Sequence, residues 1–385
     1  MSRRITLFKR VMFSAAILVG GAVLAGAVGE VVLRRGTPPP AFPASLNLHT
    51  YLNTVWHPRL SGVSSPIRHT TNQWGMRGSD PPVGDAWDTT TTIVAVGGST
   101  TQCFMLDDTR TWPAVMQRSL RARGRDVWVG NAGQDGHSTR GHLRMMAEVI
   151  SRVRPDYVLF LVGVNDLALS LNSPSKKELF DDNMTQLALG RARPDPVNWL
   201  IDHSRLAHRL YLLKRVHLDG VHVRSMSYGT TLPTEPYTGP GGPLPENLED
   251  ILTSLDLFRG NIVRLIEETR RIGATPVFFT QPLLFENTEH WDGVLARIFW
   301  IQDQRLNLSG AMFARLLNRF NTELLRICDE HGVACWDLAG RVPHDTTFYY
   351  DMVHFNDAGA AFVGEAAAEY LDHRMAASAS LHARR

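Results

Sequence analysis

From Thr91 onward, apolar runs of strand length alternate with stretches in which apolar residues recur at helical spacing. Runs that are apolar at nearly every position suit strands buried on both faces, which occur in parallel sheets covered by helices. The apolar runs lie at residues 92–96, 126–129, 157–162, 277–279 and 333–336. The helical patterns lie at residues 111–123, 139–153, 248–266, 311–330 and 357–375. This alternation predicts a three-layer α/β/α domain built on a parallel sheet.

The composition limits the classes of protein to which this chain can belong. Its 385 residues are 44% hydrophobic, which is enough to bury a sizeable core. Its 40 basic and 38 acidic residues nearly balance, whereas a nucleic-acid binder would carry a larger positive excess. The three cysteines include no Cys-x-x-Cys pair, and no His or carboxylate set has metal spacing. We therefore expect an enzyme-sized globular chain that holds no metal and no cofactor and binds no nucleic acid.

The N-terminus carries an uncharged apolar segment at residues 11–28. As a helix this segment would span roughly 27 Å, close to the hydrocarbon thickness of a bilayer. The basic residues that precede it are Arg3, Arg4, Lys9 and Arg10. Such a cluster favours the cytoplasmic side, so we predict a cytoplasmic tail at residues 1–10 and a transmembrane signal anchor at residues 11–33. Ala25-Gly26-Ala27 has the pattern of a cleavage site, and a cleaved signal peptide is the alternative. Both interpretations place the rest of the chain outside the cytoplasm, on the periplasmic side.

A proline-rich region at residues 34–90, which includes Pro38-Pro39-Pro40, lies between the apolar segment and the sheet. A semi-rigid stalk and an ordered arm packed on the domain are both open interpretations. The α/β domain follows at residues 91–376, and residues 377–385 form a tail. Within the domain, residues 167–245 form an insertion much longer than a strand-to-helix connection needs. We expect an extra helix on the sheet, and the alternatives are a lid beside the site or a basic face resting on anionic lipid.

Polar residues follow the predicted strands at their carboxyl ends, where ligands of open parallel sheets bind. The segments that follow the first three strands are Gly97-Gly98-Ser99-Thr100-Thr101, Asn131-Ala132-Gly133-Gln134-Asp135-Gly136 and Gly163-Val164-Asn165-Asp166. Asp351-Met352-Val353-His354 precedes the final helix. A serine, a histidine, a carboxylate and candidate oxyanion donors at one edge are what serine nucleophilic catalysis requires.

The spacing of these residues suggests the role of each. Asp351 and His354 are three residues apart, about one turn, so the carboxylate can hold the Nδ1–H and leave Nε2 to accept the Ser99 proton. Backbone N–H groups at the glycine turns and an asparagine side chain are candidate donors to the oxyanion.

These four blocks resemble, in the same order, those of the SGNH hydrolase family of GDSL-like esterases. The blocks are GGSTT with Ser99, NAGQDG with Gly136, GVND with Asn165, and DMVH with Asp351 and His354. The resemblance implies a flavodoxin-like fold and makes Ser99, Asp351 and His354 the catalytic residues. It also implies that the backbone N–H groups of Ser99 and Gly136 and the side chain of Asn165 form the oxyanion hole. Residues 72–78 (NQWGMRG) are similar to the segment ahead of the nucleophile in membrane-anchored bacterial members. Gly98 stands where the name-giving motif has Asp, and we expect this departure to leave the chemistry unchanged.

The three cysteines are expected to have structural roles. We expect Cys103 to be a packed small side chain rather than a reactive thiol. Cys328 and Cys335 flank a helix-to-strand turn, and a disulfide between them remains open.

The sequence therefore predicts a membrane-anchored, extracytoplasmic serine esterase. The expected location and the family resemblance imply an acyl ester on a cell-envelope glycan as the substrate, with an O-acetyl ester as one form of it. Two alternatives use other chemistry or none: an O-acyltransferase with a sugar acceptor, and a non-catalytic accessory protein of polysaccharide assembly. The complete set of catalytic residues favours an enzyme over the accessory protein.

Overall fold

The structure is a computed structural model, and it describes residues 2–36, 48, 52–172, 196–213, 254–285, 300–301, 304–305 and 310–382. The chain divides into two compact units. The smaller unit consists of Met1–Asn47 and Pro194–Val223, and the larger unit consists of Leu48–Arg193 and Arg224–Arg385. The larger unit contains the predicted sheet, and the smaller unit contains the apolar N-terminal helix.

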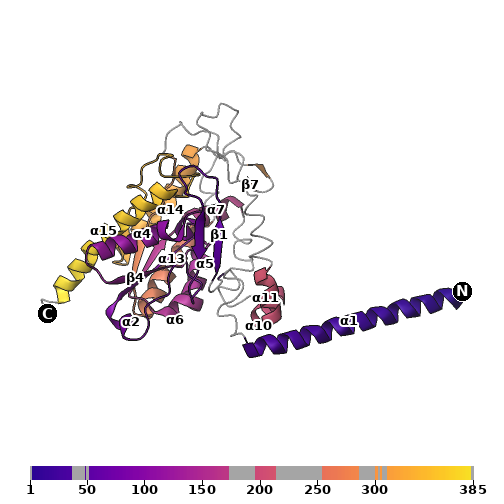
Figure 1. The fold of residues 1–385 in the computed structure, drawn as a ribbon. Coiled ribbons are helices and arrows are strands. Elements are labelled where there is room, and N and C mark those ends of the chain that lie inside the picture. The colour runs from indigo at the N-terminus through magenta and orange to yellow at the C-terminus, as the bar shows by residue number, and fades with distance from the viewer. Residues whose placement is uncertain are drawn as a thin grey trace. The chain divides into compact units, whose positions relative to one another are not determined.

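Five parallel strands form one sheet in the order β4-β3-β5-β6-β9 (Figure 1). They are β3 (Thr91–Gly97), β4 (Val127–Asn131), β5 (Tyr157–Leu161), β6 (Thr275–Phe279) and β9 (Ala334–Trp336). The predicted parallel sheet is confirmed. The chain passes from β3 to β4 on one side and then to β5 on the other, so the strand order reverses at β3. The carboxyl ends of strands beside such a reversal are where open α/β sheets bind ligands.

Helices cover both faces of this sheet, which confirms the three-layer architecture. On one face lie α4 (Trp112–Ala122) and α15 (Asp357–His382), which pack along each other (Figure 1). On the other face lie α5 (Thr139–Met145), α13 (Leu255–Arg271) and α14 (Gly310–Glu330).

Adjacent phenylalanines of β6 show how the two layers of the core are filled. Phe279 contacts Trp112 of α4 and Tyr370 of α15, each with ring centroids 6.2 Å apart. Phe278 points to the opposite face, because successive side chains of a strand alternate, and it stacks on Phe160 at 4.8 Å. The side chains of Phe278, Phe279, Phe160 and Trp112 are fully buried, as expected for strands enclosed on both sides.

Three helices differ from their predicted bounds. The helix predicted at residues 139–153 is interrupted, because a π-helical turn (Met146–Ile150) separates α5 from α6 (Ser151–Val153). Helix α13 begins at Leu255, and residues 248–253 lie outside the described residues. Helix α15 continues to His382 and includes most of the predicted tail.

Short elements complete the larger unit. Strands β1 (Asn53–Trp56) and β2 (Ile67–Thr70) pair antiparallel, as do β7 (Trp300–Ile301) and β8 (Gln304–Arg305). The short helices are α2 (Asp85–Thr89), α3 (Ser99–Gln102), α7 (Val164–Asn172) and a 3₁₀ turn at Asp108–Arg110.

The proline-rich region is ordered where the structure describes it. From residue 52 to residue 90 the chain belongs to the larger unit and contains β1, β2 and α2. This part is an arm that packs on the α/β domain, and residues 37–47 lie outside the described residues.

The smaller unit contains α1 (Ser2–Gly36) and two helices of the insertion, α10 (Pro196–His203) and α11 (Arg205–Leu213). Within α1, Met12–Arg35 is long and apolar enough to cross a membrane, with a mean hydropathy of 2.2, and a signal sequence would meet the same criteria. The remainder of the insertion, residues 173–195 and 214–245, lies outside the described residues.

Cys328 of α14 and Cys335 of β9 form a disulfide, with their Cα atoms 5.9 Å apart. The bond ties the end of one covering helix to the edge strand of the sheet. The pairing that the sequence left open is therefore present in this structure.

Candidate active site

Ser99 lies at the carboxyl end of β3, as the first residue of the short helix α3. The turn that leads into it is tight. A Cβ atom on Gly97 would lie 2.1 Å from Thr101 Oγ1, so only glycine fits there without displacing the helix. Ser99 is half-buried, and its side chain remains accessible at the edge of the sheet.

Hydrogen bonds join Ser99, His354 and Asp351 in a chain. The Nε2 atom of His354 lies 2.7 Å from Ser99 Oγ, and its Nδ1 atom lies 2.6 Å from Asp351 Oδ2. The other carboxylate oxygen of Asp351 accepts the backbone N–H groups of Val353 and His354 at 2.9 and 2.8 Å, which fixes the carboxylate. The Tyr350 ring stacks on the imidazole, with centroids 5.5 Å apart and planes 5° apart. The structure therefore brings together the three residues predicted to be catalytic.

The electrostatic surroundings favour a basic imidazole. Burial of the His354 ring opposes protonation, but the negative charge and hydrogen bond of Asp351 outweigh it and raise the pKa of His354. The charge of Asp135, an exposed residue beside Gly136, acts in the same direction. Burial also disfavours the charged form of Asp351, yet His354 and the backbone N–H groups lower the pKa of this carboxyl.

Of the two other predicted oxyanion residues, Gly136 lies on the loop that follows β4, and Asn165 is the second residue of α7, just after β5. Gly136 has φ +72°, in the left-handed region that favours glycine. Its loop is held to β3, because the Gln134 N–H donates to the Gly97 carbonyl at 3.0 Å. Asn165 Nδ2 donates to the His137 carbonyl at 2.9 Å, which leaves the second N–H of the amide for another acceptor.

Gly98 lies directly against the side-chain amide of Asn165. A Cβ atom at residue 98 would lie 2.3 Å from Asn165 Nδ2. The absence of a side chain at this position therefore lets the Asn165 amide lie directly against the turn that carries Ser99.

The buried carboxylate of Asp166 ties the loop that carries Gly136 to the start of α7. Both oxygens of Asp166 accept the Thr139 N–H at 3.2 Å, and Oδ1 also accepts the Thr139 hydroxyl. Asn261 of α13 donates to that hydroxyl at 3.0 Å. Burial raises the pKa of Asp166 to about 6, against the opposing effect of the Thr139 hydrogen bonds. Asp166, next to Asn165, thus holds the loop of Gly136 against the start of α7.

Arg77 belongs to the segment at residues 72–78 that resembles membrane-anchored family members, but no sequence pattern assigned it a role of its own. Its side chain is 3% exposed, and its Nε atom forms an ion pair with Asp108 Oδ1 at 2.7 Å. The guanidinium nitrogens donate to the backbone carbonyls of Gln102, Cys103, Leu106 and Arg68. The Gln102 carbonyl ends α3 and the Cys103 and Leu106 carbonyls follow it, so Arg77 clamps the chain that leaves Ser99. No periodic pattern could have shown this, because the partners are backbone atoms distant in sequence.

The segment at residues 72–78 forms a closed loop that positions Arg77. The Asn72 side chain accepts the N–H groups of Trp74 and Met76 at 2.9 and 3.1 Å and donates to the Ser79 carbonyl. Gly75 has φ +68°, a conformation that this turn requires and that favours glycine. The Arg77 N–H then donates to the Asn131 carbonyl at the end of β4.

Cys103 is not placed for nucleophilic chemistry. It is buried, and burial raises the pKa of its thiol to about 11. A neutral, enclosed thiol is a weak nucleophile, which agrees with the expected packing role. In the part of the chain that the structure describes, no group of three His, Cys, Asp or Glu side chains could hold a metal ion.

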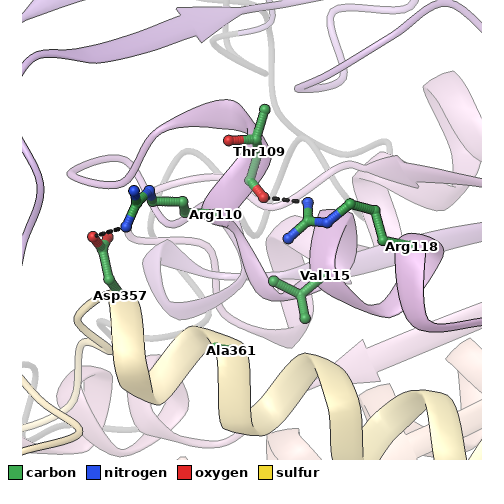
Figure 2. A pocket seen from close by; sticks show the side chains of 6 residues that line it. All are labelled: Thr109, Arg110, Val115, Arg118, Asp357 and Ala361. Atoms are coloured by element: carbon green, nitrogen blue, oxygen red, sulfur yellow. Dashed lines mark hydrogen bonds and ion pairs between the residues drawn. The ribbon is translucent and has the colours of Figure 1, made fainter.

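A separate hollow of about 360 Å³ lies between α4 and the start of α15 (Figure 2). It is lined by Thr109, Arg110, Val115, Arg118, Asp357 and Ala361. Arg110 is paired with Asp357 at 2.7 Å, and Arg118 donates to the Thr109 carbonyl (Figure 2). Both cations already have partners, and none of the three predicted catalytic residues lines the hollow.

A parallel α/β/α sandwich with hydrogen-bonded Ser, His and Asp residues at the carboxyl edge of its sheet is an arrangement found in serine hydrolases. Residues 95–362 match the GDSL-like Lipase/Acylhydrolase family, and the chain belongs to that family.

Similar proteins include two esterases. The chain is 31% identical to Esterase TesA of Pseudomonas aeruginosa over 75 residues, a stretch that covers 20% of this chain and 37% of that protein. Over 74 residues it is 27% identical to the Arylesterase of Vibrio mimicus, which covers 19% of this chain and 37% of the other. The matches thus span well under half the length of these curated relatives. Among solved structures, Axe2, an acetylxylan esterase from Geobacillus stearothermophilus, is similar at 14% identity, with 72% and 91% of the two chains covered and a TM-score of 0.39.

Replacing Arg77 with Ala should destabilise the larger unit by about 3–5 kcal/mol, because the buried Asp108 pair and several carbonyls lose their partner. Denaturant unfolding of the purified chain measures this difference. The control is Arg110→Ala, which removes an ion pair whose arginine side chain is 50% exposed and should cost about 1 kcal/mol or less. Equal losses in the two variants would show that Arg77 does not clamp the nucleophile segment.

Proposed function

We propose that this protein is a serine esterase that hydrolyses acyl esters through an acyl-enzyme intermediate. The observation that carries the proposal is the chain of hydrogen bonds from Asp351 through His354 to Ser99, at 2.6 and 2.7 Å. Membership of the GDSL-like Lipase/Acylhydrolase family supports the same chemistry.

In this mechanism Ser99 Oγ attacks the ester carbonyl while His354 Nε2 accepts its proton. Asp351 holds the Nδ1–H and stabilises the imidazolium that forms. His354 then gives the proton to the leaving alcohol, and the acyl group remains on Ser99. Water, deprotonated by His354, attacks this ester and releases the acid, which restores the free serine.

The oxyanion of each tetrahedral intermediate would be held by the N–H groups of Ser99 and Gly136 and the amide of Asn165. Asn165 is suited to this role because the His137 carbonyl and Gly98 fix its amide beside Ser99. Loss of one such donor typically costs about 10²–10³ in rate.

We further propose that α1 anchors the enzyme in a membrane, with the larger unit on the periplasmic side. The basic residues before the apolar segment favour a cytoplasmic N-terminus. The Cys328–Cys335 disulfide supports an oxidising compartment for the larger unit. At that location an O-acetyl ester on a cell-envelope glycan is a substrate within reach, and it is the one that we propose.

Replacing Ser99 with Ala should lower hydrolysis of a short-chain aryl ester by about 10⁴-fold or more and abolish labelling by a fluorophosphonate. Cys103→Ala is the matched control, because it removes the buried free thiol four residues after Ser99 and should keep both signals. Full activity of Ser99→Ala would overturn the mechanism. Labelling without hydrolysis in the wild type, together with acyl transfer to an added sugar, would instead indicate the acyltransferase.

The pH dependence should report the raised pKa of His354. His354 must be neutral to accept the Ser99 proton, so kcat/KM should fall as the pH is lowered through this pKa. Asp135→Asn removes a charge that raises this pKa, so the acid limb should move to lower pH, by roughly half a unit or less because Asp135 is exposed to solvent. The control Asp345→Asn also removes a surface carboxylate and should leave the limb in place. A shift to higher pH in Asp135→Asn would contradict the assignment.

The proposed location can be measured with the full chain carrying an N-terminal epitope and a C-terminal alkaline phosphatase. An anchored, extracytoplasmic protein should show an active phosphatase in a membrane fraction that retains the epitope. An active phosphatase without the epitope would identify a cleaved signal peptide. An inactive phosphatase on an intact protein would place the larger unit in the cytoplasm.

A further inference from the structure

We propose that α10 and α11 form an interfacial hairpin that rests in the headgroup layer of the membrane surface from which α1 emerges. This inference rests on the membrane span proposed for α1 and does not depend on the ester chemistry. It assigns a lipid surface as the binding partner of α10 and α11, which belong to the insertion at residues 167–245.

Glu30, near the end of α1, fastens the hairpin. Its carboxylate accepts the backbone N–H groups of Arg205 and Leu206 at 3.0 and 2.9 Å and the Ser204 hydroxyl at 2.8 Å. The first N–H groups of a helix have no partner within that helix. Glu30 therefore caps the N-terminus of α11 from another helix, with a charge of the sign that this end of the helix dipole favours.

Two further contacts hold the hairpin against the last turns of α1. Arg34 donates from Nη2 to the His203 carbonyl at 3.1 Å and from Nε to Glu30 at 2.7 Å. Leu206 packs on a surface of small residues, because its Cδ2 atom lies 4.0 and 3.8 Å from where Cβ atoms on Gly26 and Gly29 would stand. The start of α11 is thus held over the segment from Gly26 to Arg34.

This attachment determines the depth of the hairpin relative to the membrane. Eighteen residues separate Met12 from Glu30, and at 1.5 Å per residue they span about 27 Å, close to the hydrocarbon thickness of a bilayer. With α1 across a bilayer, Glu30 lies at its boundary. The helix that Glu30 caps must then begin at the same level, where lipid headgroups and water mix.

The exposed surface of the hairpin suits that environment. Its large apolar side chains are half or more exposed: Trp199 (50%), Leu200 (51%), Leu210 (58%) and Leu213 (52%). Exposed Arg209 lies beside them on α11, and Arg34 and Arg35 are exposed at the end of α1. Tryptophan and leucine mixed with arginine are typical of helices that lie in the membrane interface, since the apolar groups enter the acyl boundary and the cations face phosphates.

The test uses the full chain in vesicles of phosphatidylcholine that carry nitroxide-labelled headgroups. Leu213→Cys places a single reactive thiol on the hairpin, because Cys103 is buried and Cys328 and Cys335 are bonded to each other. An environment-sensitive fluorophore on this thiol should be quenched by the nitroxides. Val28→Cys, on α1 two residues before Glu30, is the reference for the depth of the span. Val83→Cys, an apolar residue 73% exposed on the larger unit, is the aqueous control.

We expect quenching at Leu213→Cys close to that at Val28→Cys and well above that at Val83→Cys. Quenching at Val28→Cys with none at Leu213→Cys would overturn the hairpin proposal while leaving the anchor intact. A probe at residue 213 that is shielded from water but not quenched would overturn it too, since a second copy or another part of the chain would then cover this face. No quenching at Val28→Cys would show that α1 does not span the bilayer, and both proposals would fail.

Glu30→Ala removes the cap and should reduce quenching at residue 213. The control Arg35→Ala, at an exposed residue near the end of α1, should leave it unchanged. Aryl-ester hydrolysis, measured on the same vesicles, should be unchanged in both variants. Quenching at residue 213 that is unaffected by Glu30→Ala would show that the carboxylate does not hold the hairpin at the membrane surface.

Discussion

The hydrogen bond between Ser99 and His354 joins residues 255 positions apart in the chain, and the architecture of the larger unit makes it possible. All five strands of the sheet are parallel, so the segments that follow them emerge at one edge. Ser99 leaves the strand at which the strand order reverses. The loop before α15 returns His354 and Asp351 to the same edge. Any change that tilted β3 or shifted α15 along α4 would separate the imidazole from the hydroxyl.

Two buried charged side chains support this geometry, and both do so through hydrogen bonds to backbone groups. Arg77 holds carbonyls at the end of α3 and in the segment after it, and Asp166 holds the N–H of Thr139. Backbone partners do not depend on the identity of the neighbouring side chains. The loops that carry Ser99 and Gly136 are therefore fixed, while residues at the rim, such as exposed Asp135, can adjust the charge around His354.

In the smaller unit, too, a charged side chain binds backbone groups that lie far away in the sequence. Glu30 lies at the polar end of an apolar helix and satisfies the first N–H groups of a helix that comes from the insertion. At the boundary of the proposed membrane span, this carboxylate thereby gains partners that offset its desolvation. The start of α11, which is not needed for the sheet, thereby obtains a defined place beside α1.

The sequence by itself determined the layers and most strand positions, because these depend on periodicity. It also proposed the candidate active-site residues, through four short blocks at strand ends that resemble one family in the same order. It also identified the apolar span. Only the tertiary structure decided the partners of Arg77, the position of Gly98 against Asn165, and the docking of α11 on Glu30. These contacts join segments far apart in the chain, often through backbone atoms, which are the same in nearly every residue. No local pattern of side chains can therefore predict them.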